Sequence, residues 1–189
     1  MTPELEFGIF QMSAQRPSIN WNRYLDRMVD EAQLCDELGY DEYWIGEHHS
    51  AGHELPPDSL MFLSRVAEVT SNIRLGPMTV NLPYDINDPF NTAERLAFLD
   101  QLSHGRAMYG YGAGALPRDM DMFVEDMESQ KDNMWEAIDA VEKYTHAEEP
   151  TDFDGEFYQY EDRLVQLPPL QEDPQSVIAG LTSPGSFSG

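Results

Sequence analysis

The sequence predicts an α/β fold in which parallel strands alternate with helices. Short apolar runs recur between longer segments whose apolar residues repeat every three or four positions, and Gly or Pro residues mark many of the boundaries. With 189 residues, 41% of them hydrophobic, the chain can bury one core, so we expect a single domain over residues 1–189. An open doubly wound sheet and a (β/α) barrel both satisfy this pattern.

The N-terminal segment predicts a strand–helix–strand unit. Leu5–Gln11 is a short apolar run suited to a buried strand. From Trp21 to Leu38 the apolar residues recur at helical spacing, and Gly39 suits the C-terminus of that helix. Tyr40–Gly46 is the second predicted strand. Because a helix connects them, the two strands are expected to be parallel neighbours.

The same pattern continues through the middle of the chain. Asp58 or Ser59 is positioned to cap a second helix, and Ile73–Leu82 is the third predicted strand. Asp88 and Pro89 have the residue types expected at the N-cap and first turn of a third helix.

The last part of the chain adds two more strands and a turn. Arg106–Tyr111 predicts the fourth strand and Ser129–Tyr144 the fourth helix. Asp154-Gly155, between aromatic residues, predicts a small hairpin or tight turn. Gln175–Gly180 predicts the fifth parallel strand.

The charge balance restricts the partners and the environment of the protein. The 35 acidic residues outnumber the 11 basic ones, for a net charge of −24, which disfavours nucleic acid as a partner. The acidic residues are dispersed and lysines are scarce, a pattern that favours a halophilic source. No apolar run is long enough to span a membrane, and the N-terminus lacks a signal-peptide pattern, so we expect a cytoplasmic protein. Cys35 is the single cysteine, and we expect it to be a structural residue of the core.

Glu47, His48 and His49 directly follow the second predicted strand. In barrel enzymes the carboxyl ends of the strands carry the functional groups. Two imidazoles beside a carboxylate can donate or accept protons near neutral pH, which makes these residues candidates for general acid–base catalysis. The structural alternative is that one histidine packs under a loop while the other is solvated.

Other chemistries are less well supported by the residues present. A metal site would need His48 and His49 together with His53 and Glu54, but adjacent residues of an extended segment point to opposite sides. Nucleophilic hydrolysis lacks a Gly-x-Ser-x-Gly elbow. No Gly-x-Gly-x-x-Gly turn follows the first strand, which disfavours a dinucleotide-binding fold.

Four segments, in order, carry a resemblance to a known family. They are WIGEHHSAGHE (Trp44–Glu54), IRLGPMTVNLPY (Ile73–Tyr84), AERLAFLDQLSHGRAMYGYGAGALPRD (Ala93–Asp119) and LPPLQEDPQSVIAGLTSPGS (Leu167–Ser186). Together they span nearly the whole chain, and the ordered set resembles the bacterial-luciferase-like flavin-dependent monooxygenases, most closely their limonene-monooxygenase-like branch.

The resemblance implies a parallel (β/α) TIM-barrel fold in which this chain is the N-terminal part. Since a complete barrel has eight βα units, we expect an incomplete barrel of about five, truncated at the C-terminus. The family implies reduced FMN as cofactor, O2 as co-substrate and a small organic molecule as substrate. It further implies a separate flavin reductase and, for the full-length parent, a homo-oligomer.

The resemblance also implies roles for individual residues. His48 matches the histidine that acts beside the flavin, with Glu47 and His49 as its catalytic neighbours. The cofactor-binding positions implied by the family are Gly76, Pro77 and Met78 on the third strand, Gly112, Ala113 and Gly114 after the fourth, and Gly180, Leu181, Thr182 and Ser183 after the fifth. Luciferases have an arginine where this chain has Ala113, so a phosphate contact at that position is not carried over.

Two alternatives remain open at this stage. A related barrel enzyme could use a deazaflavin for hydride transfer without oxygen chemistry. A non-catalytic flavin-binding relic would instead show no turnover with any cofactor.

Overall fold

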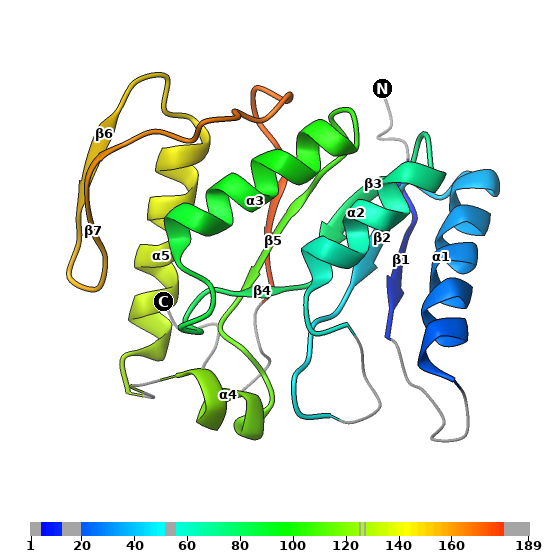
Figure 1. Cartoon of the computed structure of the whole chain (residues 1–189), viewed down its shortest axis with the longest axis horizontal. Coiled ribbons are helices and arrows are strands. Elements are labelled where there is room, and N and C mark those ends of the chain that lie inside the picture. The colour runs from blue at the N-terminus through cyan, green and yellow to red at the C-terminus, as the bar shows by residue number, and fades with distance from the viewer. Residues whose placement is uncertain (1–4, 13–19, 52–55, 125, 127, 180–189) are drawn as a thin grey trace.

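The computed structural model describes residues 5–12, 20–51, 56–124, 126 and 128–179, and Figure 1 shows strands alternating with helices along them. The parallel strands are β1 (Gly8–Gln11), β2 (Glu42–Ile45), β3 (Arg74–Pro77), β4 (Val80–Asn81), β5 (Tyr109–Gly112) and β8 (Ser176–Ile178). The helices are α1 (Trp21–Glu37), α2 (Ser59–Val69), α3 (Pro89–Leu102), α4 (Pro117–Phe123) and α5 (Gln130–Thr145). β6 (Thr151–Asp154) and β7 (Gln159–Arg163) form an antiparallel hairpin.

The parallel strands follow one another in space in the order of the chain. β1, β2 and β3 pair in parallel, and so do β4, β5 and β8. A parallel bridge between Leu75 and Ala107 joins the two groups. With helices between the strands, this is the arrangement of a (β/α) barrel rather than of a doubly wound sheet, whose strand order reverses at a switch point.

The main core lies between the sheet and the helices. Helices α2 and α3 contact each other, α1 packs on α2, and α5 packs on α3. The predicted helix starts are confirmed, because the Asp58 and Asp88 carboxylates each accept a 2.9 Å hydrogen bond from a backbone amide in the first turn of α2 and α3. None of the helices in these described ranges is long and apolar enough to cross a bilayer.

Three predicted elements differ in detail from the structure. The third predicted strand divides into β3 and β4 at the Met78–Thr79 peptide bond, which is cis. The fourth begins at Tyr109 rather than at Arg106, although Ala107 already forms a parallel bridge with Leu75 of β3. The fifth is limited to β8, and the hairpin predicted at Asp154-Gly155 is confirmed.

Candidate active site at the carboxyl ends of the strands

A cavity of about 290 Å³ lies at the carboxyl ends of the parallel strands. It is lined by Phe10, Met12, Glu47, His48, Met78, Thr79, Asn81, Gly112, Ala113, Gly114, Ala115 and Ala179. These residues come from the ends of β1, β2, β4, β5 and β8 and from the segment between β3 and β4. Barrel enzymes bind their ligands at this end of the sheet.

Six of the predicted site residues meet in this cavity. They are Glu47, His48, Met78, Gly112, Ala113 and Gly114. His49, Gly76 and Pro77 are not among the lining residues, although His49 is adjacent in sequence to His48 and Pro77 to Met78. The predicted phosphate-binding turn Gly180, Leu181, Thr182 and Ser183 lies outside the described residues.

Gly76 makes room for a tryptophan inside the barrel. A methyl group added at Gly76 would lie 2.3 Å from the Trp44 ring, too close for any side chain. Gly110 on the neighbouring strand is equally constrained, since a methyl group there would lie 1.9 Å from the Pro77 carbonyl oxygen. The absence of a side chain at Gly76 is therefore explained by packing against Trp44 inside the barrel, next to the cavity.

The segment after β5 gives the cavity a wall of backbone and methyl groups. A methyl group at Gly112 would lie 2.4 Å from Thr79 Oγ1, so glycine lets β5 approach the end of β3 closely. Gly114 has a positive φ of 88°, a conformation that glycine adopts without strain. Together with Ala113 and Ala115, these residues present a surface without bulky side chains, on which a flat ring can lie.

His48 is held by a carboxylate from a distant part of the chain. Its Nδ1 lies 3.3 Å from Oδ2 of Asp119, a fully buried residue in α4. Burial acts to raise the pKa of Asp119, but hydrogen bonds from Ser50, the His49 backbone amide and His48 outweigh it and hold this pKa below its ordinary value. Asp119 is therefore ionised at neutral pH. A carboxylate only accepts hydrogen bonds, so Nδ1 carries the proton in this contact and Nε2 is the nitrogen that can gain or lose one.

His49 has a different environment from that of its neighbour. Its ring packs edge-on against Phe123 of α4, with centroids 4.6 Å apart, and lies 6.2 Å from the ring of Tyr84. Its Nε2 lies 3.7 Å from Glu47 Oε1. Glu47 raises the pKa of His49, against the opposing effect of burial.

Glu47 connects the end of β2 to the start of α2. Its Oε2 accepts a 2.9 Å hydrogen bond from the Ser59 backbone amide and a 2.8 Å bond from the Ser59 hydroxyl. Backbone amides in the first turn of a helix lack partners within the helix, so a carboxylate there is well stabilised. The structure thus gives Glu47 and His49 packing and anchoring contacts, while His48 and Asp119 form a second imidazole–carboxylate pair at the cavity.

Comparison with known proteins identifies the family to which this chain belongs. A family model described as luciferase-like monooxygenase matches residues 5–187. The chain belongs to the luciferase-like monooxygenases. It is 32% identical over 181 residues to limonene 1,2-monooxygenase of Rhodococcus erythropolis, an alignment that covers 96% of this chain and 46% of the relative.

Solved structures of luciferase-like proteins share the fold. Monooxygenase RslO1 from Streptomyces bottropensis matches 96% of this chain and 55% of its own, with a TM-score of 0.85 and 26% identity. The oxygenating constituent of 3,6-diketocamphane monooxygenase from Pseudomonas putida, solved in complex with FMN, matches 93% of this chain and 51% of its own, with a TM-score of 0.81 and 24% identity. The chain thus spans about half the length of these relatives.

Several residues of the candidate site were not singled out by sequence reasoning. Asp119 and Phe123 belong to α4, a helix of seven residues that was not predicted. Pro117 at its first position and Asp119 in its first turn are typical helix-start residues and could have revealed it. Thr79 and Asn81 also line the cavity, and the Thr79 hydroxyl donates a 2.9 Å hydrogen bond to Asn81 Oδ1.

The alternative of a metal site rests on four residues, of which the structure describes His48 and His49. Within the described residues, no group of three or more His, Cys, Asp or Glu side chains is placed to hold a metal ion. His53 and Glu54, which that alternative requires, lie outside those residues.

Proposed function

We propose that this chain provides the flavin-binding part of a monooxygenase that uses reduced FMN and O2 to oxygenate a small organic substrate. The observation that carries the proposal is the cavity at the strand ends, where His48, held by Asp119, lies beside the side-chain-poor segment Gly112–Ala115. The monooxygenase names of its relatives support the same reaction type.

The residues of the cavity fit a flavin ring. Gly112, Ala113 and Gly114 allow close approach of a flat ligand, and Phe10 and Met78 add apolar surface. Gly76 and Pro77 precede Met78 in the chain, and we assign them the role of supporting the part of the cavity lining that Met78 forms. The phosphate group is assigned to the turn Gly180–Ser183, and one structural neighbour is described as a complex with FMN.

His48 is the proposed acid–base group of the reaction. Bound reduced FMN would supply the electrons and the site at which O2 is activated. His48 lines the same cavity, so its imidazole is placed to exchange a proton with oxygen or substrate there. Asp119 acts through His48 by fixing the ring and its protonated nitrogen.

Glu47 and His49 are proposed as positioning residues. Glu47 lines the cavity, yet its carboxylate is occupied by Ser59 at the start of α2. His49 contributes its backbone amide to Asp119 Oδ2, at 3.2 Å, and its ring to the contact with Phe123. Both residues therefore act on the reaction through the geometry of His48.

The partners follow from the same proposal. The largely apolar side chains of the cavity suit a small organic substrate. A relative from Acinetobacter baylyi is named the oxygenase component of a flavin-dependent trigonelline monooxygenase, which supports a separate flavin reductase here. A cytoplasmic homo-oligomer is the proposed state of the full-length protein.

Cofactor titration tests this proposal. FMN and a deazaflavin would each be added to the protein while flavin fluorescence is followed, and product formation would then be compared with and without O2. Saturable FMN binding and O2-dependent oxygenation by the full-length protein are expected. Hydride transfer with the deazaflavin but no oxygenation with FMN would replace the proposal by the deazaflavin alternative. Failure with both cofactors would favour the non-catalytic relic.

A further inference from the structure

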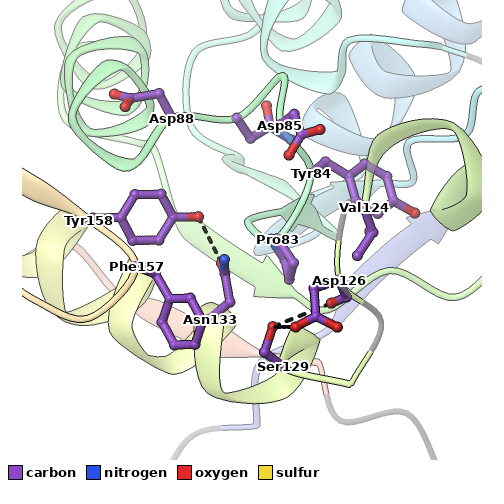
Figure 2. Close-up of a pocket in the computed structure, with 11 residues that line it drawn as sticks. Pro83, Tyr84, Asp85, Asp88, Val124, Asp126, Ser129, Asn133, Phe157 and Tyr158 are labelled. Carbon is purple, nitrogen blue, oxygen red and sulfur yellow. Dashed lines mark hydrogen bonds between the residues drawn. The ribbon is translucent and has the colours of Figure 1, made fainter.

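A second cavity, of about 440 Å³, has a lining separate from that of the strand-end site. It is bounded by the segment after β4, the segment that joins α4 to α5 with the first turns of α5, and the turn of the β6–β7 hairpin (Figure 2). Its described lining residues are Pro83, Tyr84, Asp85, Asn87, Asp88, Val124, Asp126, Ser129, Asn133, Phe157 and Tyr158. None of them lines the cavity that contains His48.

Two aromatic side chains, Phe157 and Tyr158, contribute to its walls (Figure 2). The ring of Tyr84, which also belongs to the lining, is buried and stacks on Phe123. The Tyr158 hydroxyl donates a 2.7 Å hydrogen bond to Asn133 Oδ1 on α5. The backbone amides of Phe157 and Tyr158 each donate a 2.8 Å bond to Oε1 of Glu136, also on α5. These contacts fix the hairpin turn against the helix, so the backbone that carries Phe157 and Tyr158 is held by contacts within the chain.

The charged residues that line the cavity are all aspartates. Asp85, Asp88 and Asp126 line it, and its described lining contains no Lys, Arg or His. Figure 2 shows the three carboxylates spread around the opening rather than meeting at one point. Burial raises the pKa of Tyr158 to about 12, and the nearby charges of Asp88, Glu136 and Asp85 add to this effect although the bond to Asn133 opposes it. The Tyr158 side of the cavity therefore lies in a negative potential.

Two of the three aspartates also have structural tasks. Asp126 Oδ2 accepts a 2.8 Å hydrogen bond from Ser129 Oγ, and Asp88 Oδ2 accepts a 2.7 Å bond from the Tyr160 hydroxyl. Both remain negatively charged acceptors on the cavity wall. Asp85 is exposed, so it is the most suitable of the three carboxylates to change without disturbing the fold.

We propose that this cavity binds an organic ammonium ion, with the aromatic rings around its alkyl groups and the carboxylates balancing its charge. Aromatic faces attract a cation of low charge density, and the effect grows when water is excluded. An anion would meet unfavourable charge on each side. A bare divalent metal ion would require converging ligands, and the described residues form no group suited to one.

Choline and its neutral isostere 3,3-dimethylbutan-1-ol are suitable probes, since they share shape and differ in charge. Each would be titrated into the protein at constant ionic strength, with binding followed by ligand-observed NMR. Choline should bind saturably, and the neutral alcohol much more weakly. Phe157→Ala should weaken choline binding by roughly threefold or more. Asp85→Asn should weaken it by about threefold to fivefold.

Asp139→Asn is the matched control, because Asp139 is exposed on α5 and does not line the cavity. It removes the same charge as Asp85→Asn and should leave choline binding unchanged. Equal weakening by both substitutions would show only a general attraction of cations to an acidic protein and would overturn the proposal. The absence of saturable binding, or equal binding of choline and the alcohol, would also overturn it. Each variant's circular dichroism spectrum would confirm that it folds.

Discussion

His48 and His49 are adjacent in the sequence, yet the structure gives them different carboxylates and different surroundings. The His48 side chain is 25% exposed, lines the strand-end cavity and pairs with Asp119. The His49 side chain is only 10% exposed, pairs with Glu47 and packs on Phe123. Of these two identical side chains, one residue apart, His48 thus lines a cavity and His49 packs beneath it.

The origin of each carboxylate accounts for much of this difference. Glu47 is two residues from His49 and is itself bound to Ser59 at the start of α2, so that pair joins one loop to one helix. Asp119 is 71 residues from His48 and reaches it only because α4 lies over the end of β2. The His48 pair therefore depends on the barrel being folded, and it presents its imidazole where a ligand can bind.

The largest expected effect is that of His48→Ala on the chemical step. If His48 exchanges a proton during oxygenation, its loss should slow product formation by about 10²–10⁴-fold. FMN binding should change little, and more hydrogen peroxide should form per flavin oxidised. Product and peroxide would be measured together in the full-length protein. Normal product yield in this variant would remove the proposed distinction between the two histidines.

Asp119→Asn tests whether the carboxylate acts through His48. Since hydrogen bonds to charged groups contribute about 1.5–3 kcal/mol, oxygenation should fall by roughly 10-fold to 100-fold. FMN binding should change little, because Asp119 does not line the cavity. Asp121→Asn, an exposed change on the same helix, is the control and should alter neither quantity. A loss of FMN binding as large as the loss of oxygenation in Asp119→Asn would limit Asp119 to a structural role.

His49→Ala should affect stability more than chemistry. It removes the edge-on contact with Phe123 and leaves a space beside Tyr84, for which we expect a loss of about 1–2 kcal/mol in the free energy of unfolding. Urea denaturation measures this loss, with the exposed His146→Ala as control. A drop in oxygenation as large as that of His48→Ala would contradict the assignment of His49 to packing.

The two histidine–carboxylate pairs should affect the stability of the fold in different pH ranges. Glu47 raises the pKa of His49 above its ordinary value of 6.5, so this pair stabilises the fold fully below pH 6.5 and loses its effect as the pH rises through the folded-state pKa. The pKa of Asp119 lies below its ordinary value of 3.8, so its stabilisation is present above pH 3.8 and disappears as the pH falls through the folded-state pKa. Denaturation across pH in Glu47→Gln should lose only the first of these dependences.

The dependence of the melting temperature on salt should distinguish the effect of surface charge from that of the two histidine–carboxylate pairs. Screening of the net charge of −24 should raise the melting temperature toward molar KCl. The buried pairs are screened much less, so wild type and His49→Ala should rise in parallel. Thermal melts in a KCl series measure both slopes. A flat or falling melting temperature would remove the inference of a halophilic source.

The amino-acid sequence by itself determined where the parallel strands lie along the chain and the place of Glu47 and His48 at a strand end. Both follow from local patterns: apolar periodicity, helix caps at Asp58 and Asp88, and a motif directly after a strand. The sequence motifs also indicated the luciferase-like family, which the family match confirms.

Only the tertiary structure decided which carboxylate contacts which histidine. Asp119 and Phe123 are distant from the motif along the chain, and no periodicity or spacing relates them to it, because the short helix α4 is positioned by packing rather than by a local pattern. The division of the third predicted strand at Met78–Thr79 and the close packing of Gly76 on Trp44 are likewise visible only once neighbouring strands lie side by side. Local patterns specify where a strand ends, but the groups that meet there depend on contacts between distant segments.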